Sequence, residues 1–536
     1  MPNARQLALQ RVRRRFSSST LPTGAERTGS VAEASTRGGS SFIGWTPSLT
    51  PADQENRSLG RDLAVARARD LVANEPLAAA AMDRKVDMVF GMRGLRFSSL
   101  PDGEALGLDP EETAALGDQI ERAFNDWSQD TLWRCDWEQS ENWGGLCALM
   151  ARHYFRDNEA IAVLRWDELP AFEFPFHTSL HVVDPDRISN PDNRPDTPEL
   201  RAGVETDGRR VVAYHIRNAH PNDWTFGSVA DAMTWTRVPR QADYGRPIVL
   251  HLRRKDRADE VRGWGPLMAT LKKFKDLSRY TDAEIQSAVV RAVMAMVIYS
   301  DRSTQGIEEA LSVQDIKNFA DASDAFYGPG GPKLTDGTRI QKLFPTEKVE
   351  MLTANSEGGD YEAFTSVFSR QLASALGMTY EQFTMDWSKT NYSSARAGLI
   401  EVWRSVESFV DLFTSKVGRP VLLAVIDDAV ESGHIVVPDH VPDIYENPRA
   451  WLDGIWLGSG RGWVDPVKEP MGAGLEMEIG ASTLQDVTAR QGRDWRQVSQ
   501  QRAREQREFD KLGINPPKPV AEVAALVASK SDEGGA

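Results

Sequence analysis

The sequence predicts an α+β protein that is mainly helical and contains a small β-rich part. Two observations predict this class. Apolar residues recur at helical spacing on both sides of residues 160–255, and that middle stretch consists of short runs rich in β-branched and aromatic residues. The 536 residues are enough for about three domains, and a composition of 40% hydrophobic and 26% charged residues is ordinary for a globular protein.

Net charge and cysteine content limit the function classes. The formal charge is −15, whereas a protein that grips duplex DNA through its phosphates needs a basic face. The balance argues against tight nucleic-acid binding but leaves room for a protein that handles DNA without holding it. Cys135 and Cys147 can form neither a disulfide framework nor a zinc module, which favours a reducing compartment. We expect no metal and no cofactor. We also expect no membrane span, because the most apolar helical stretch, 285–299, is short and contains Arg291.

Residues 1–55 are rich in Ser, Gly, Thr and Arg and have few periodic apolar positions. Arginine-rich, acid-poor composition is shared by transit peptides and by disordered basic arms. We predict a disordered arm.

Helices are predicted on the N-terminal side of the β-rich stretch. Apolar residues between Leu59 and Val86 follow helical spacing, and Pro76 marks a break between two helices. A third helix is predicted over 110–128, with Asp109 as its cap and Pro110 at its first position.

The β-rich stretch predicts a small mixed or antiparallel sheet. Within it, "HVVDPDRI" offers His181, Asp184 and Asp186, which could in principle bind a metal. Asp-Pro-Asp after a strand is more typical of a turn with local capping, so we predict a turn. The tryptophan-rich run "WSQDTLWRCDWEQSENW" is interpreted as core or subunit interface rather than as a platform for stacking bases.

Long helices follow the β-rich stretch. Residues 266–300 lack an internal break and predict one helix of about 50 Å, too long for the core of one compact domain. Such a helix must cross between layers or line an assembly. Further helices are predicted over 360–376 and over 393–430, the latter with a kink at Pro420. Residues 301–358 predict a compact insertion, and its "GPGGPKLTDG" lacks the spacing of a phosphate-binding loop.

The stretch "DWSKTNYSSAR" allows two hypotheses. Lys389, Tyr392 and Ser393 could form the nucleophile and activator of a hydrolase. No G-x-S-x-G turn surrounds the serines and no glycine-rich nucleotide turn occurs. The alternative, which we favour, is that Asn391 or Ser393 caps the next helix while Tyr392 packs against the protein.

Segments along most of the chain resemble the lambda-type family of tailed-phage portal proteins, the head-tail connectors. The matching segments, in order, are "ANEPLAAAAMDRKVDMVFG", "SLHVVDPDRISNP", "AGVETDGRRVVAYHI", "VLHLRRKDRADEVRGWGPLMATLKKFKDLSRYTDAEI", "SALGMTYEQFTMDWSKTNYSSARAGLIEVWR" and "VDPVKEPMGAGLEMEIGASTLQDVTARQGRDWRQVSQQRAREQ".

The resemblance implies a non-enzymatic ring of subunits, twelve in the virion, at a unique capsid vertex and assembled in the host cytoplasm. Double-stranded DNA would enter and leave through the ring, touching it weakly and non-specifically. The implied protein partners are further copies of the chain, the terminase large subunit, the major capsid protein and a head-tail adaptor.

The resemblance also implies a portal fold with a partly β-rich wing, long stem helices, a clip insertion and a helical crown. The implied division is an arm (1–55), wing (56–265), first stem helix (266–300), clip (301–358), second stem helix (359–378), channel loop (379–392), kinked wing helix and following segment (393–470), crown (471–520) and disordered tail (521–536). Thr384, Lys389, Thr390 and Asn391 are the residues expected to face DNA. Asn391 and Ser393 are expected to cap the junction with the next helix.

Overall fold

The computed structural model describes residues 50–52, 58–91, 94–167, 174–223, 228–293, 297–300, 321, 322, 325, 347–350, 360–463 and 465–514. The chain divides into two units, residues 1–55 and 56–536, and the elements described below belong to the second. The predicted arm, apart from residues 50–52, and the predicted tail lie outside the described residues.

The N-terminal helices begin and end as their sequences dictate. Helices α3 (Ser58–Asn74) and α4 (Pro76–Phe90) are separated at the predicted proline. Helix α6 (Pro110–Ser128) starts with the predicted Asp109 cap, whose carboxylate accepts hydrogen bonds from the Glu111 and Glu112 N–H groups. In return, the Glu112 carboxylate accepts a hydrogen bond from the Asp109 N–H, which completes a capping box. The short helix α5 (Gly103–Leu106) precedes α6, and α7 (Trp143–Asp157) follows it.

The β-rich part forms two antiparallel sheets rather than one. The first has the order β3 (Thr178–Val183), β2 (Glu159–Trp166), β8 (Val249–Arg253). The second has the order β4 (Leu200–Arg201), β5 (Val204–Asp207), β6 (Arg210–Arg217), β7 (Trp235–Pro239). A small separate core that includes Ile161, Val204 and Tyr214 joins them, and this core needs both sheets to exclude water. Short helical turns η3 (Pro185–Arg187), η4 (Pro191–Asn193) and α8 (Ser228–Asp231) connect the strands.

The helix predicted over 266–300 is shorter than expected at both ends. Helix α9 spans Leu271–Val293, and strand β9 (Val297–Ser300) pairs with β10 (Glu347–Glu350). Helical spacing of apolar residues extends into β9, but its β-branched and aromatic residues also favour a strand, and pairing with β10 decides between the two. Apart from 321, 322, 325 and β10, the predicted insertion, including its glycine-rich turn, lies outside the described residues.

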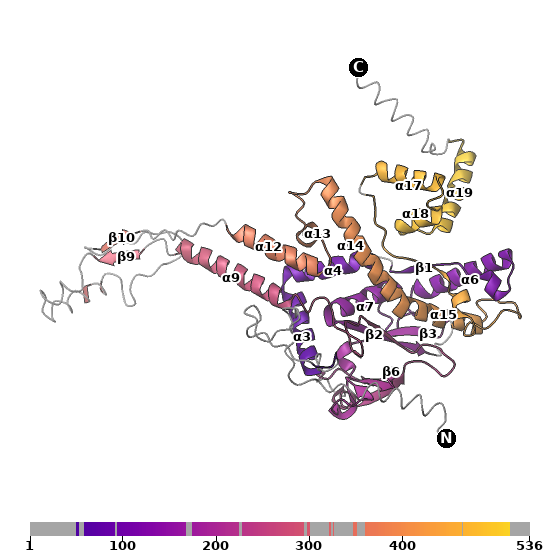
Figure 1. Cartoon of the computed structure of the whole chain (residues 1–536), viewed down its shortest axis with the longest axis horizontal. Helices are drawn as coiled ribbons and strands as arrows, with labels where there is room; N and C mark the ends of the chain where they lie inside the picture. The colour runs from indigo at the N-terminus through magenta and orange to yellow at the C-terminus, as the bar shows by residue number, and fades with distance from the viewer. Residues whose placement is uncertain are drawn as a thin grey trace, which may run out of the picture. The chain divides into compact units, whose positions relative to one another are not determined.

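Two later helices agree with the sequence. Helix α12 (Asp360–Ala375) lies beside α9, where the Tyr280 ring stacks on Tyr361 and lies 4.2 Å from the Phe364 ring centroid (Figure 1). The helix predicted over 393–430 consists of α14 (Tyr392–Phe413), a π-helical turn η5 (Thr414–Gly418) and α15 (Arg419–Glu431). This irregular turn ends two residues before Pro420, which has no N–H to donate to the preceding turn. The sequence predicts a kink at Pro420, and the structure has a π-helical turn just before that residue.

The main core gathers aromatic side chains from α4, α6, α7 and α14. Trp127 and Trp143 are fully buried there, and the Phe90 ring lies 4.8 Å from that of Phe413. Trp133 and Trp137 of the same tryptophan-rich run are 44% and 41% exposed. The run therefore supplies both core residues and exposed aromatic side chains.

The C-terminal part begins with α16 (Pro448–Trp451) and β11 (Gly454–Leu457), and β11 pairs antiparallel with β1 (Arg96–Ser99). Three helices follow: α17 (Lys468–Glu478), α18 (Leu484–Arg490) and α19 (Trp495–Leu512). The predicted boundary at 470/471 falls inside α17, so this helical part begins at Lys468. No helix of the described residues has the length and apolarity needed to cross a membrane.

A buried charge network, centred on Glu159, ties the sheets to the chain that enters α9. The Glu159 carboxylate is fully buried and accepts bonds from Arg61 (2.5 Å), Arg262 (Nε, 2.6 Å), His251 (2.9 Å) and the Gly263 N–H (2.9 Å). Arg262 also donates to three backbone carbonyls, those of Pro185, Ile188 and Ala202. A Cβ at Gly263 would clash with the Asn158 carbonyl oxygen, so this close approach requires glycine.

Candidate functional site

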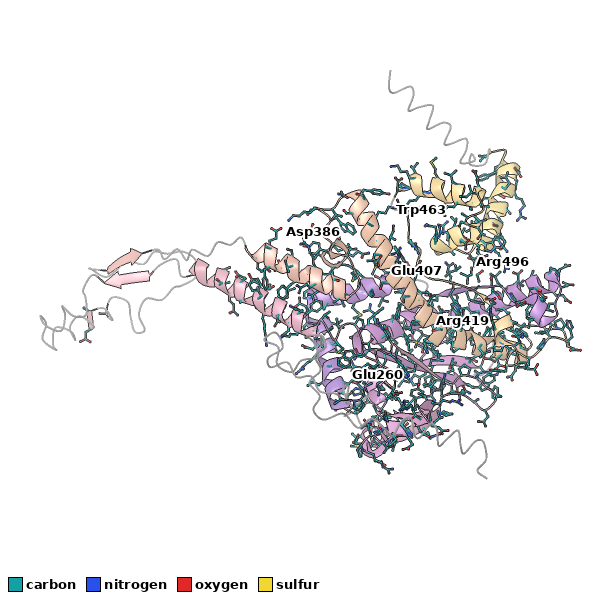
Figure 2. All side chains as sticks on the ribbon, in the orientation of Figure 1. Glu260, Asp386, Glu407, Arg419, Trp463 and Arg496 are labelled. Atoms are coloured by element: carbon teal, nitrogen blue, oxygen red, sulfur yellow. The ribbon has the colours of Figure 1, made fainter. Side chains whose placement is uncertain are left out.

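The candidate site is the segment between α12 and α14, which contains the residues predicted to face DNA. The sequence predicts a loop over 379–392. The structure differs in part, because residues Tyr380–Thr384 form helix α13. Thr379 and Gln382 form its capping box, which explains why this short polar sequence becomes helical. Figure 2 marks Asp386 in the turn that follows α13.

Helix α4 anchors this segment. The Phe383 side chain is fully buried, and Arg84 donates to the carbonyl oxygens of Gln382 (2.5 Å) and Phe383 (2.8 Å). Lys85 donates to the carbonyl of Leu376 at 2.9 Å. Burial lowers the pKa of Lys85 to about 8. Its ammonium group therefore loses a proton more readily than that of an exposed lysine. The base of the segment is therefore rigidly attached, and the turn after Thr384 is the part that reaches solvent.

Local hydrogen bonds shape the turn over 385–391. Met385 adopts a left-handed conformation (φ 59°) that ends α13. The Asp386 carboxylate accepts from the Ser388 N–H (3.0 Å) and hydroxyl (2.6 Å). These bonds hold the pKa of Asp386 below its usual range. The Thr390 hydroxyl donates to Glu381 at 2.9 Å, which closes the turn back on α13.

Lys389 forms an ion pair across the two helices. Its ammonium lies 2.8 Å from Oε1 of Glu362 on α12, and both side chains are about four-fifths exposed. The hydrogen bond lowers the pKa of Glu362 and raises that of Lys389. Because both groups are in water, the pair adds little stability. It does partly neutralise the one lysine of this turn.

The other predicted residues mainly hold the backbone. The Thr384 hydroxyl donates to the Tyr380 carbonyl (2.9 Å) at the end of α13. Asn391 is the N-cap of α14, and its Oδ1 accepts from the Ser394 N–H at 2.9 Å. Ser393 lies inside the first turn, and its hydroxyl donates to the same Oδ1. Of the two residues that the sequence offered as the cap, the structure therefore has Asn391. The structure thus places Lys389, Thr390 and Asn391 on one turn, with Thr384 at its start.

The hydrolase hypothesis finds no geometric support here. Within the described segment no hydrogen bond joins Lys389 to Ser393 or Tyr392, and the Ser393 hydroxyl is directed to the cap of its own helix. Tyr392 is 48% exposed, so the prediction that it packs against this chain is wrong. Its position in the first turn of α14 places the ring outside the core that Val402 and Phe409 enter further along.

Two features of the turn were missed. Met385 and Trp387 are 58% and 41% exposed, so the turn presents apolar as well as polar groups. Two large apolar residues in a polar run are a visible signal in the sequence. Glu362 was also missed, because no local pattern relates residues 27 positions apart in sequence.

A second candidate site, a metal cluster, has a residue set that was only partly foreseen. Asp184, Asp186 and His220 bring ligand atoms within 4.8 Å of one another, whereas His181 lies elsewhere, beside Trp137. Arg69 donates to Asp186 (2.6 Å) and Asp184 (3.1 Å), so a guanidinium already supplies the positive charge. Asp184 also accepts from the Asp186 N–H, as expected of a capped turn.

Comparisons with known proteins agree on one family. The family model described as "Phage portal protein, lambda family" matches residues 38–409, more than half of the chain. The portal protein of Escherichia phage N15 is 28% identical over 507 residues, covering 92% of this chain and 93% of that protein. Portal protein B of Escherichia phage lambda is 27% identical over 497 residues, covering 90% of each. A chain from the neck of an empty gene transfer agent particle is 13% identical with a TM-score of 0.39, covering 88% of this chain and 96% of that one. A TM-score of this size does not establish a shared fold.

Proposed function

The chain belongs to the lambda family of phage portal proteins, and from this membership we propose that its copies close into a ring, of twelve in the virion, at one capsid vertex. A portal protein is a structural component of the virion at the head-tail junction, and it serves genome packaging without being an enzyme. The hydrolase hypothesis for Lys389, Tyr392 and Ser393 is therefore abandoned. In our proposal the ring is the conduit for double-stranded DNA during packaging and ejection.

The proposed division of the chain follows the elements of the fold. The two sheets with α3 to α7 form the wing, α9 and α12 form the stem, and residues 301–358 form the clip. Residues 379–392 border the channel, α14 and α15 cross the wing, and α17 to α19 form the crown. In this arrangement the ring meets the terminase large subunit and a head-tail adaptor at the clip, and the major capsid protein at the wing.

One observation carries the ring proposal: the α9–α12 pair leaves apolar side chains in water. Ile285 and Val289, one turn apart on α9, are 57% and 56% exposed, and Val367 on α12 is 48% exposed. Two paired helices cannot cover their outer apolar faces by themselves. Neighbouring copies in a ring would bury these faces.

The ring is tested by electron microscopy and light scattering of the purified chain. We expect ring-shaped class averages down the axis and a mass near twelve times the 59.5 kDa chain. Ile285→Asp should lower the fraction of rings without unfolding the monomer, because the side chain is already exposed. Val436→Asp, at a position 72% exposed and away from α9, is the matched control. A chain that stays monomeric under all conditions contradicts the proposal.

The role of the turn is tested with a pair of variants of opposite charge effect. Lys389→Ala removes the cation nearest the proposed DNA path and should lower DNA retention in packaged particles. Glu362→Gln frees Lys389 from its partner. This variant should raise DNA retention, since an unpaired ammonium attracts phosphate more strongly. Ring formation should be unchanged in both. Loss of rings in Lys389→Ala would show that the turn is a subunit contact instead.

A further inference from the structure

Helix α17 carries an apolar stripe that the described part of its own chain leaves uncovered. Met471 and Leu475 lie in α17, and Val467 and Ile479 are its N-cap and C-cap residues. The four are spaced four apart, which puts them on one side of the helix. They are 55%, 39%, 59% and 78% exposed. Glu478 lies beside the end of the stripe, is exposed, and has no ion-pair partner among the described residues. A stripe of this kind on a soluble surface marks a contact with another molecule.

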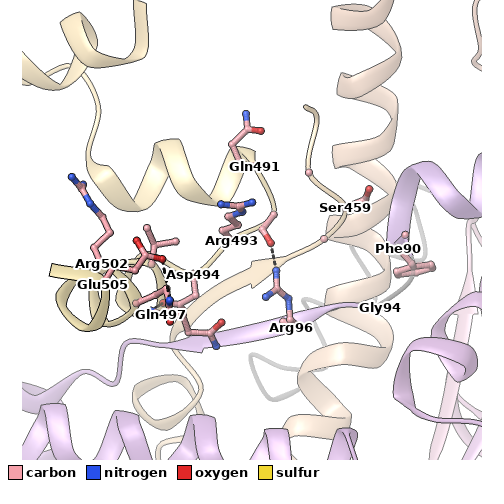
Figure 3. Close-up of a pocket in the computed structure, with 16 residues that line it drawn as sticks. Phe90, Gly94, Arg96, Ser459, Gln491, Arg493, Asp494, Gln497, Arg502 and Glu505 are labelled. Atoms are coloured by element: carbon pink, nitrogen blue, oxygen red, sulfur yellow. Dashed lines mark hydrogen bonds between the residues drawn. The ribbon is translucent and has the colours of Figure 1, made fainter. Parts of the chain in front are cut away.

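A groove lies beside helix α19 of the same C-terminal part. It has a volume of about 840 Å³ and runs between α19, β1 and the segment that joins β11 to α17 (Figure 3). Five of the sixteen residues that line it are glycines: Gly91, Gly94, Gly458, Gly460 and Gly492. Side chains are excluded there because backbones approach closely; a Cβ at Gly460 would clash with the Gln491 carbonyl oxygen. These glycines therefore let backbone pack against backbone, and the volume of the groove beside them can admit side chains from outside.

Unpaired arginines lie along this groove. Arg493 and Arg502 line it, both are exposed, and neither forms an ion pair among the described residues. Arg96, in contrast, donates to the Gly492 carbonyl. The groove thus offers two guanidinium groups that have no ion-pair partner among the described residues, beside the carboxylates of Glu505 and of Asp494, the buried cap of α19. The end of the stripe offers a carboxylate without a cation.

The C-terminal helices are also incompletely packed on their own chain. Helix α19 has no buried side chain, and in α17 only Ala473 is buried. At their junction with the body, the indole N–H groups of Trp456 and Trp495 and the amide of Gln485 are buried without hydrogen-bond partners among the described residues. Buried donors of this kind are rare in a completed structure.

We propose that the α17 stripe of one copy packs into the groove beside α19 of the next copy, with Glu478 facing Arg493 and Arg502. The inference rests on the proposed ring, because a ring is built from two different complementary surfaces on each subunit. The charge complementarity favours a second copy of this chain over an unrelated partner. The contact is heterologous, so it repeats around the ring and closes with it.

Engineered cysteines test this contact. Leu475→Cys and Gln497→Cys place one thiol on the stripe and one in the groove. The native Cys135 and Cys147 are buried, and burial raises their pKa values, so they do not compete. Mild oxidation of rings carrying both substitutions should give a ladder of linked subunits. Rings mixed from the two single variants should give only linked dimers, and each single variant alone should give none.

The outcomes separate this inference from the ring itself. Rings that form but give no ladder, or only a link within one chain, overturn the α17 contact and leave the ring standing. A wild-type chain that forms no rings overturns both. If the thiol introduced by Leu475→Cys is protected from a maleimide without any link to the groove, another partner covers the stripe, which also overturns the proposal.

Charge exchange gives a test that does not depend on disulfide geometry. Glu478→Arg and Arg502→Glu should each slow ring assembly several-fold at low salt, because like charges then meet at the contact. The double variant should recover most of the lost rate. A double variant as slow as the two singles combined contradicts the pairing.

Discussion

Glu159 lies at the start of β2 and balances two buried guanidinium groups, those of Arg61 and Arg262. The Arg262 and Arg61 guanidiniums hold the pKa of Glu159 well below its usual range, against the opposite effect of its burial. Glu159→Gln would leave Arg262 buried without its counter-charge and Arg61 with only the exposed Asp62 carboxylate, 3.5 Å away. We expect a loss of about 3–5 kcal/mol in the free energy of unfolding, the usual effect of removing one partner of a buried pair. The measurement is urea unfolding followed by circular dichroism.

The control for this variant is Glu401→Gln, which breaks the exposed pair with Arg404 on α14. It should leave the unfolding midpoint almost unchanged, since exposed pairs contribute little. Equal effects of the two variants would mean that the buried network does not hold the sheets to the chain entering α9.

His181 and His251 make stability depend on pH. Burial lowers both pKa values to about 4, from about 6.5 in an unfolded chain. Between pH 6.5 and 4 the unfolded chain binds protons at these positions and the folded chain does not. Stability therefore falls as pH decreases through this window, by up to about 1.4 kcal/mol per pH unit for each histidine. His181 is the better variant, because His251 also bonds Glu159. His181→Asn should reduce the slope of the unfolding free energy against pH between 4 and 6.5; an unchanged slope would show that His181 does not stay neutral in the fold.

Helix α14 shows what a cap contributes to an element. Asn391→Ala removes the acceptor for the Ser394 N–H and should cost about 1 kcal/mol of stability. Ser393→Ala removes only a hydroxyl that bonds to the same oxygen and should cost much less. Urea unfolding of the two variants decides between them. A larger loss for Ser393→Ala would restore the alternative that the sequence alone left open.

At the scale of elements, periodic and capped segments could be predicted from the sequence. The break at Pro76, the Asp109 cap and the interruption near Pro420 each depend on neighbouring residues, so local reasoning was sufficient. The strand at Val297–Ser300 and the separation into two sheets depend on partners far along the chain. The Lys389–Glu362 pair is the same kind of case. Lys389 was predicted as a candidate residue, but the carboxylate that partly neutralises its charge could not be predicted.

The buried residues of the main core all precede the last three helices in the sequence. The buried residues of that core end at Trp451, and α17 to α19 contribute few buried side chains of their own. The last three helices, which we propose meet neighbouring copies, are therefore largely separate from the unit that folds, whereas α9 and α12 belong to it. An acidic chain of net charge −15 also suits the proposed conduit, because a surface that repels phosphate lets DNA slide past it.

This separation predicts the effect of truncation. A chain ending at Trp463, without α17 to α19, should unfold at nearly the same temperature as the full chain, because it loses little buried apolar surface. Its ability to form rings should fall, because it lacks both the stripe and part of the groove. A chain ending at Glu446 is the control: it also loses β11, the partner of β1, and the buried Trp451, and it should melt at a clearly lower temperature. Calorimetry and light scattering on the same samples distinguish the two effects. If the chain ending at Trp463 melts as early as the control, the last three helices belong to the folding unit, and a loss of rings would reflect unfolding instead of a missing contact.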